Sequence, residues 1–165
     1  MERSIARQRA AGCLFGLALG DALGAATEFL SVREILRRFP PAGPQEPQGH
    51  PARVTDDTQM SLAVGEALLE ATRPYSARTL EQPLRRAFVT WANSPDNDRA
   101  PGMTCIRACD NLARGMPWYV ATVHSSKGCG ANMRVAHGLQ AWPPEWIDNI
   151  EYYDRLTRLG EAWDR

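Results

Sequence analysis

The stretch Val54-Thr55-Asp56-Asp57-Thr58-Gln59-Met60 places two adjacent carboxylates between two threonine hydroxyls. Apolar residues at helical spacing follow, which predicts a helix over residues 58–71 with the acidic stretch at its start. Carboxylate and hydroxyl oxygens are the ligands that hard divalent cations prefer. Acidic residues at a helix start also satisfy free backbone N–H groups and the helix macrodipole. Both readings remain open, and on the residues alone a helix cap is the more frequent use.

On either side of this stretch the chain has the pattern of helices separated by glycine, proline and asparagine turns. No segment shows the alternation of a half-buried strand, so the sequence predicts an all-α fold. A proline-rich loop over residues 40–53 leads to the acidic stretch. The other expected helices cover residues 5–19, 32–39 with Ser31 as N-cap, 76 or 79 to 91, 104–112, a helix opened by the glycine-rich turn at 125–134, and a C-terminal helix from Pro143.

Glycines recur every four residues along the first expected helix, at Gly12, Gly16 and Gly20. Small residues on one stripe allow another helix to approach closely, so we expect helix packing there. The apolar run of residues 10–26 is interrupted by these glycines and by Asp21. It fits neither a signal peptide nor a membrane span, so the expected location is the cytoplasm, with no membrane partner.

The length and composition fit one domain that spans residues 1–165. With 19 basic and 19 acidic residues the formal net charge is zero, which argues against a nucleic-acid partner. The four cysteines form no Cys-x-x-Cys pair, and we expect them to be reduced.

Three motifs occur in order: the glycine-rich segment 12–29, the stretch from Thr55 to Met60, and the turn from Gly128 to Arg134. In this order they resemble the opening motifs of the ADP-ribosylglycohydrolase family. The ending, Trp142-Pro143-Pro144-Glu145-Trp146-Ile147 with Tyr153-Asp154-Arg155-Leu156, is similar to the closing helix of that family. The three ordered motifs are more specific together than any one alone, and the resemblance covers nearly the whole chain.

This resemblance implies a helical domain with two magnesium or manganese ions in a central cleft. The implied reaction is hydrolysis of the bond between ADP-ribose and a protein side chain, so the expected partner is ADP-ribose or an ADP-ribosylated protein. The implied metal ligands are Thr55, Asp56 and Asp57. The implied catalytic residues are Glu28, Asp56 and Asp57, and the implied substrate-binding residues are Gly128, Gly130, Asn132, Met133 and Arg134.

The sequence also departs from the family pattern, because the second acidic motif that completes the family's metal shell is absent. We therefore expect an internally truncated domain with the seam of a deletion near residues 136–141, and one metal ion or none is an alternative to two. The leading hypothesis is a metal-dependent ADP-ribosyl hydrolase. The alternatives are a catalytically inactive ADP-ribose-binding or interaction module, and a degraded sequence without a function of its own. The chain is expected to be a monomer or a homodimer.

Overall fold

The computed structural model of this chain describes residues 2–126, 130 and 132–134. Apart from an isolated β-bridge between Gly49 and Ala52, the regular structure in these residues is helical, which confirms the all-α prediction. The expected deletion seam and the C-terminal helix lie outside the described residues. The described elements are α1 (Glu2–Gly24), α2 (Val32–Arg38), α3 (Asp56–Glu70), α4 (Ala77–Ala92), α5 (Met103–Ala113), α6 (Trp118–Ala121) and the 3-10 helix η1 (Asn132–Arg134).

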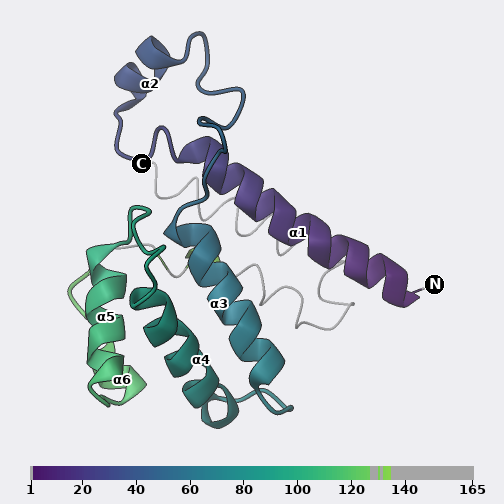
Figure 1. The fold of residues 1–165 in the computed structure, drawn as a ribbon, viewed down its shortest axis with the longest axis vertical. Coiled ribbons are helices and arrows are strands. Elements are labelled where there is room, and N and C mark those ends of the chain that lie inside the picture. The colour runs from purple at the N-terminus through teal and green to yellow at the C-terminus, as the bar shows by residue number, and fades with distance from the viewer. Residues whose placement is uncertain (1, 127–129, 131, 135–165) are drawn as a thin grey trace.

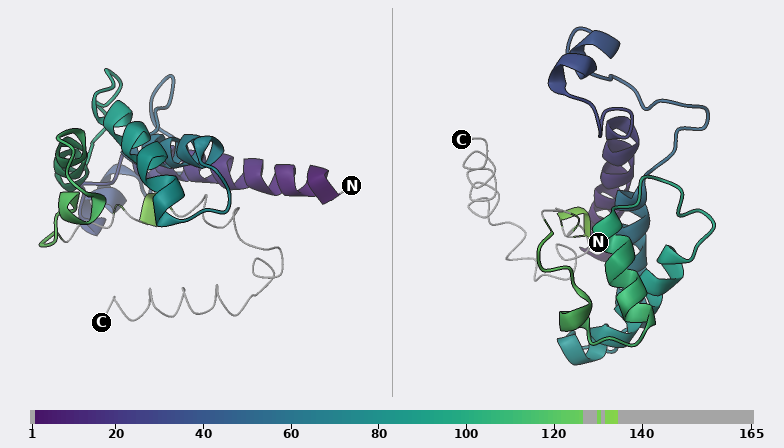
Figure 2. Two further views of the ribbon diagram at one scale, coloured as in Figure 1. Left: turned by 90° about the horizontal axis from the view of Figure 1, so that it is seen from below. Right: turned by 90° about the vertical axis from the view of Figure 1, so that its left-hand side faces the viewer.

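The central part of the structure is a group of three neighbouring helices, in which α3 packs against α4 and α4 against α5 (Figure 1). The short α6 packs on α5, and η1 packs on α3. Helix α1 is a long rod that contacts α3 and extends away from this group, as Figure 2 shows from a second direction. Helix α2 and the proline-rich loop lie beyond the C-terminal end of α1. The start of α3 is therefore the meeting point of α1 and the central helices.

The hydrophobic core lies between the central helices. Its buried cluster consists of Met60 from α3, Trp91 from α4 and Cys109 from α5. Helix α3 also buries Ala63 and Ala67, which follow Met60 at spacings of three and four and so share its face. This spacing explains why α3 packs on α4 along its length while its N-terminal turn stays available for other contacts.

Most helix starts follow the sequence signals. Ser31 and Ser76 each form a capping box, with Glu34 and Thr79 respectively, as expected for the helices that they begin. The prediction for the first helix was too short, because α1 continues through Gly20 and Asp21 to Gly24. A single glycine costs a helix only about 1 kcal/mol relative to alanine, and the neighbouring alanines and leucines offset that cost.

The glycine stripe of α1 does not hold a second helix in the described structure. A Cβ atom added at Gly12, Gly16, Gly20 or Gly24 would meet no described atom within 4 Å. The expected close helix packing is therefore not supplied by the part of the chain that the structure describes. Gly16, Gly20 and Gly24 instead line a cleft next to the start of α3.

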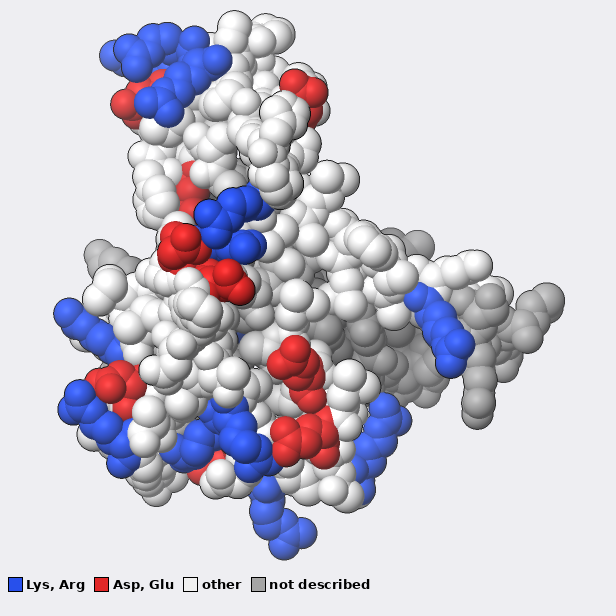
Figure 3. Space-filling model, viewed as in Figure 1, with Lys and Arg blue, Asp and Glu red and all other residues white. Residues whose placement is uncertain are grey.

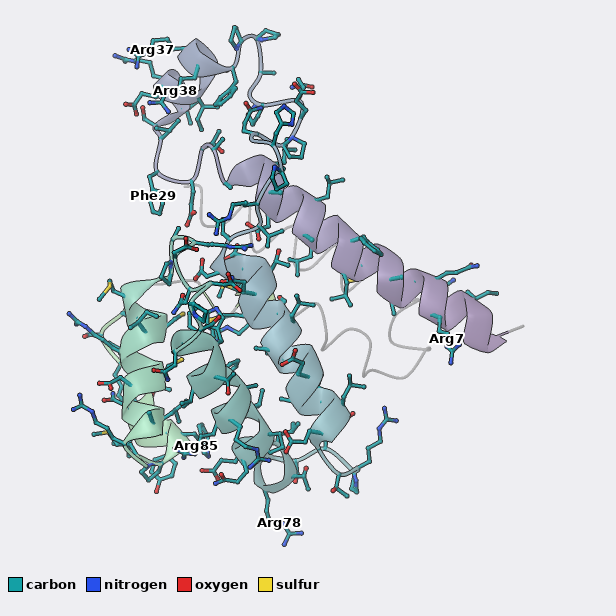
Figure 4. The ribbon with its side chains drawn as sticks, viewed as in Figure 1. Arg7, Phe29, Arg37, Arg38, Arg78 and Arg85 are labelled. Carbon is teal, nitrogen blue, oxygen red and sulfur yellow. The ribbon has the colours of Figure 1, made fainter. Side chains whose placement is uncertain are left out.

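Arg85 ties α4 to the end of α5, in the lower part of the view in Figure 4. Its guanidinium donates hydrogen bonds to the carbonyl oxygens of Leu112 at 2.7 Å and Met116 at 2.9 Å, and it pairs with Glu81 at 3.2 Å. Because α5 ends at Ala113, the arginine gives the Leu112 carbonyl oxygen a further donor and fixes the turn that holds Met116.

Charges of both signs are scattered over the face shown in Figure 3, and a compact basic group lies over α2. The basic residues in the last turn of α2 are Arg37 and Arg38. None of the described helices is both long enough and apolar enough to cross a membrane.

Candidate active site

The acidic stretch lies at the N-terminus of α3, and its N-cap is Thr55 rather than either aspartate. The Thr55 hydroxyl accepts a hydrogen bond from the backbone N–H of Asp57 at 3.3 Å. Asp56 and Asp57 occupy the first turn of α3, where the helix macrodipole favours negative charge. The stretch thus caps the helix as one of the two readings expected, but the capping group is the Thr55 hydroxyl, and the two aspartates interact with the helix macrodipole. The Thr55 cap does not occupy the two carboxylates, although Asp56 Oδ2 accepts a hydrogen bond from the Gly102 N–H.

A third aspartate, Asp21 of α1, accepts four hydrogen bonds from the start of α3. Its Oδ2 accepts from the backbone N–H groups of Thr55 at 2.8 Å and Thr58 at 3.2 Å, and from the Thr58 hydroxyl at 2.5 Å. Its Oδ1 accepts from the Thr55 hydroxyl at 2.6 Å. Asp21 was not among the site residues predicted from the sequence. A carboxylate inside an apolar helix is a usable signal, because a partly buried charge needs partners. That signal could not identify partners 34 and 37 residues away.

Asp56 joins α3 to the turn that precedes α5. Its side chain accepts a hydrogen bond from the Gly102 backbone N–H at 3.3 Å, and its own N–H donates to the Arg99 carbonyl oxygen at 3.1 Å. Only 5% of the residue is exposed. Burial is the main reason why the pKa of Asp56 is raised, the hydrogen bond from Gly102 opposes this, and the charge of Asp21 raises it further.

Asp57 and Glu28 extend the group of mutually repelling carboxylates. Burial raises the pKa of Asp57 most, and repulsion from Asp56 and Asp21 adds to it. The pKa of Glu28 is also raised, first by partial desolvation and then by Asp56, Asp57 and Asp21. Glu28 lies in the exposed turn after α1, beside Phe29, which points outward (Figure 4). A raised pKa makes a carboxylate a stronger base than usual, which suits a group that accepts a proton during a reaction.

The glycine-rich turn reaches the same place from the other end of the described chain. The buried hydroxyl of Ser61 on α3 donates a hydrogen bond to the Met133 carbonyl oxygen, which fixes η1 against α3. Arg134 donates to the Gly130 carbonyl oxygen at 2.9 Å and to Cys105 Sγ at 3.3 Å. Its positive charge lowers the pKa values of Asp56 and Asp57, in opposition to burial. Ser61, like Asp21, was not anticipated from the sequence, because a serine within a helix carries no distinctive pattern.

These groups border one open cleft of about 870 Å³. The acidic stretch and the described part of the glycine-rich turn thus lie at one cleft, while the chemical roles of these residues remain predictions. Gly128 lies outside the described residues. The cleft is lined by the predicted residues Glu28, Thr55, Asp56, Asp57, Gly130, Asn132, Met133 and Arg134, together with Asp21 and with Gly16, Gly20 and Gly24 of α1.

The donor atoms in this cleft suit a hard cation only in part. Within the described residues, no group of three or more His, Cys, Asp or Glu side chains is close enough to hold a metal ion. Asp56 and Asp57 nevertheless offer carboxylate oxygens in a cleft where negative charges repel one another. Mg²⁺ commonly binds through one or two carboxylates and keeps several waters. The described residues thus fit one loosely held magnesium ion and do not by themselves form the expected two-ion centre.

The fold and the cleft define an all-α protein whose acidic helix start, glutamate and glycine-rich turn surround one ligand-sized hollow. The chain belongs to the ADP-ribosylglycohydrolase family, whose sequence model matches residues 2–137. That match ends before residues 142–156, so it does not extend to the resemblance noted for the closing helix. The match includes all the predicted site residues.

Three relatives illustrate the similarity. The chain is 34% identical over 128 residues to the ADP-ribosyl-[dinitrogen reductase] glycohydrolase of Rhodospirillum rubrum, which covers 75% of this chain and 40% of that protein. It is 32% identical over 135 residues to the ADP-ribosylarginine hydrolase Tri1 of Serratia proteamaculans, and the match covers 78% of this chain and 35% of Tri1. It is 36% identical over 132 residues to an uncharacterized protein of Archaeoglobus fulgidus, with 75% and 40% covered. The chain thus spans well under half the length of these relatives. No solved structure matches it significantly.

Proposed function

We propose that this chain binds an ADP-ribosyl group in the acidic cleft and hydrolyses its bond to a protein side chain. The observation that carries the proposal is the convergence of Glu28, Asp56, Asp57 and the Gly130–Arg134 turn on one cleft. Two relatives bear names that describe hydrolases of ADP-ribosylated dinitrogen reductase and ADP-ribosylarginine, which supports an ADP-ribosylated arginine as the first substrate to test.

The chemistry requires one water and one acid–base group. The water oxygen forms a bond to C1″ of the ribose while the bond from C1″ to the side-chain nitrogen breaks. Glu28 accepts the proton that the water loses and passes it to the leaving nitrogen, which returns Glu28 to its carboxylate form, so charge and atoms balance. The raised pKa of Glu28 suits this exchange, because a less acidic carboxyl group accepts a proton more readily than an ordinary glutamate does.

Other residues of the chain would hold and orient the substrate. The side chain of Arg134, at the wall of the cleft, presents hydrogen-bond donors and positive charge for a pyrophosphate. Asp56 and Asp57 would hold a divalent cation, which when bound would supply positive charge to orient the ribose hydroxyls and the water. Burial of Asp56 among backbone partners keeps that end of the cleft rigid.

The alternative function is an ADP-ribose-binding module without catalysis. It is favoured by the lack of a group of three metal-binding side chains in the part of the chain that the structure describes. Such a module would keep the glycine-rich turn and the cleft but would bind its ligand without a tightly held metal ion.

Release of ADP-ribose from an arginine-ADP-ribosylated protein, measured by chromatography in the presence of MgCl₂, separates these functions. We expect wild type and the control Asp110→Asn to release it, since Asp110 pairs with Arg114 on α5, outside the cleft. Glu28→Gln should lower kcat on the order of 10²-fold or more if Glu28 exchanges the proton. ADP-ribose binding that ignores a chelator, without release, would instead identify the binding module. A folded chain with no affinity for ADP-ribose would contradict both.

A further inference from the structure

Asp21 is the side chain through which α1 holds the functional end of α3. It projects from α1, a different helix from the one it contacts, and it uses both carboxylate oxygens for this purpose. Three hydrogen bonds reach Oδ2, and one reaches Oδ1. Hydrogen bonds to an ionised acceptor are shorter and stronger than those between neutral groups. The lengths of the two hydroxyl bonds, 2.5 and 2.6 Å, are in the range for such bonds.

These bonds hold the backbone on both sides of the two proposed cation ligands. Asp21 binds the N–H groups of Thr55 and Thr58, and Asp56 and Asp57 lie between them in the sequence. The Thr55 hydroxyl satisfies the N–H of Asp57, so Asp21 supplies acceptors for N–H groups that the local cap does not reach. The direction in which the two carboxylates leave α3 is thus set by a residue on α1.

The same contact fixes the orientation of the Thr55 hydroxyl. That hydroxyl has one hydrogen, which it donates to Asp21 Oδ1, and two lone pairs, one of which accepts from the Asp57 N–H. A hydroxyl that binds a cation must do so through a lone pair with its hydrogen turned elsewhere. Asp21 receives that hydrogen, and one lone pair of Thr55 remains in a residue that lines the cleft.

We propose that Asp21 is a positioning residue, which fixes the N-terminus of α3 and orients the Thr55 hydroxyl so that it can join Asp56 and Asp57 around a divalent cation. The cation part of this inference rests on the proposed function. The part that concerns α3 rests only on the four hydrogen bonds and can be measured without any ligand.

Amide hydrogen exchange tests the hold on α3 directly. In Asp21→Ala the amides of Thr55 and Thr58 should exchange at least about tenfold faster, because each loses a hydrogen bond to a charged acceptor. The amides in the middle of α4 should keep their wild-type rates. The control is Asp110→Ala, which removes an exposed aspartate paired with Arg114 at 2.7 Å. Equal acceleration throughout α3, α4 and α5 would reduce Asp21 to a general stabilising residue and overturn its role as a positioning residue.

Mn²⁺ binding, measured by calorimetry on the full chain, tests the orientation of the Thr55 hydroxyl. In Asp21→Asn the remaining side-chain oxygen can still accept hydrogen bonds from α3. The NH₂ group takes the place of Oδ1, so it would donate to the Thr55 hydroxyl oxygen instead of accepting the hydroxyl hydrogen. Mn²⁺ affinity should fall by about 10- to 100-fold, the usual loss when the partner of a metal ligand is changed. Thr58→Ser keeps the hydroxyl that donates to Asp21 and should bind Mn²⁺ like wild type. Thr58→Val loses that hydroxyl and should bind Mn²⁺ more weakly.

A double-mutant cycle separates orientation from loss of charge. If Asp21 acts through the Thr55 hydroxyl, Asp21→Asn should lower Mn²⁺ affinity less in a Thr55→Val background than in wild type. An equal loss in both backgrounds would assign the whole effect to charge and overturn the orientation. If wild type binds no Mn²⁺, the cation part of both proposals fails, and the exchange measurement still decides whether Asp21 fixes α3.

Discussion

Replacing Asp57 by asparagine should stabilise the metal-free protein, although Asp57 is a proposed ligand. No described residue donates a hydrogen bond to its carboxylate. Burial raises the pKa of this group, and the charges of Asp56 and Asp21 raise it further, so the ionised form is unfavourable in the folded state. Asparagine retains the shape of the side chain and removes the charge, and the repulsion should disappear with it.

The size of this effect follows from the neighbours of Asp57. Each like-charge contact in a partly exposed setting costs roughly 0.2 to 0.5 kcal/mol, and Asp57 has two such contacts besides its own desolvation. The charge of Arg134 opposes them, and so does the helix macrodipole, which favours a negative charge in the first turn of α3. We therefore expect Asp57→Asn to raise the free energy of unfolding by at most about 1 kcal/mol, which corresponds to a rise in Tm of no more than roughly 2 to 4 °C for a chain of this length.

The pH dependence gives this prediction a definite sign. Because the pKa of Asp57 is raised in the folded state, the folded chain binds its proton more tightly than the unfolded chain does. Stability attributable to this group is therefore highest at low pH and falls as pH rises through the folded pKa. The advantage of Asp57→Asn should be complete at neutral pH and should vanish towards pH 3, because wild-type Asp57 is then protonated.

Urea unfolding in the presence of a chelator, at neutral pH and at about pH 3, is the measurement. The matched control is Asp56→Asn, which also removes one charge but weakens the hydrogen bond from the Gly102 N–H. Weakening a bond to a charged acceptor costs about 1 to 3 kcal/mol, so this control should gain no stability. A loss of stability in Asp57→Asn, or a gain that persists at pH 3, would refute the reasoning.

Two further predictions concern the core and the cleft wall. Met60→Ala should lower the free energy of unfolding by about 2 to 5 kcal/mol in a denaturation experiment, whereas Met60→Leu should cost less than about 1.5 kcal/mol; similar costs for both would show that the site is not tightly packed. Gly20→Ala should stabilise α1 by about 0.5 to 1 kcal/mol, because its Cβ would meet no described atom. Gly130→Ala should instead weaken ADP-ribose binding, since its Cβ would lie 3.2 Å from both Arg134 Nη2 and Cys105 Sγ. A titration in which Gly130→Ala binds ADP-ribose like wild type would contradict this expectation. A loss of stability in Gly20→Ala would contradict the expectation for α1.

The helices were predictable because their signals are local. Ser31 and Ser76 cap the helices that follow them, and the spacing of Met60 and its neighbours predicts the buried face of α3. The end of α1 was predicted less well, because glycine weakens a helix without stopping it. Short α6 had no periodic pattern long enough to be recognised.

The candidate site was predictable in its components and not in its connections. The acidic stretch, Glu28 and the glycine-rich turn were each recognised as motifs, and the structure brings their described parts to one cleft. The contacts of Asp21 with Thr55 and of Ser61 with Met133 join residues 34 and 72 positions apart. Such pairs depend on how the helices pack, and one sequence contains no local pattern that reveals them.

The bond between Asp21 and α3 has a consequence for folding as well as for the site. Helix α1 extends away from the central helices, and its hydrogen bonds to Thr55 and Thr58 are made at the end where it meets α3. Detachment of α1 in a local opening event would therefore release the start of α3 at the same moment. A ligand that binds only the form in which α1 is attached to α3 would reduce the population of the open form by mass action. The protease sensitivity of the N-terminal part of α1 could then report occupancy of a cleft that lies at the C-terminal end of the same helix.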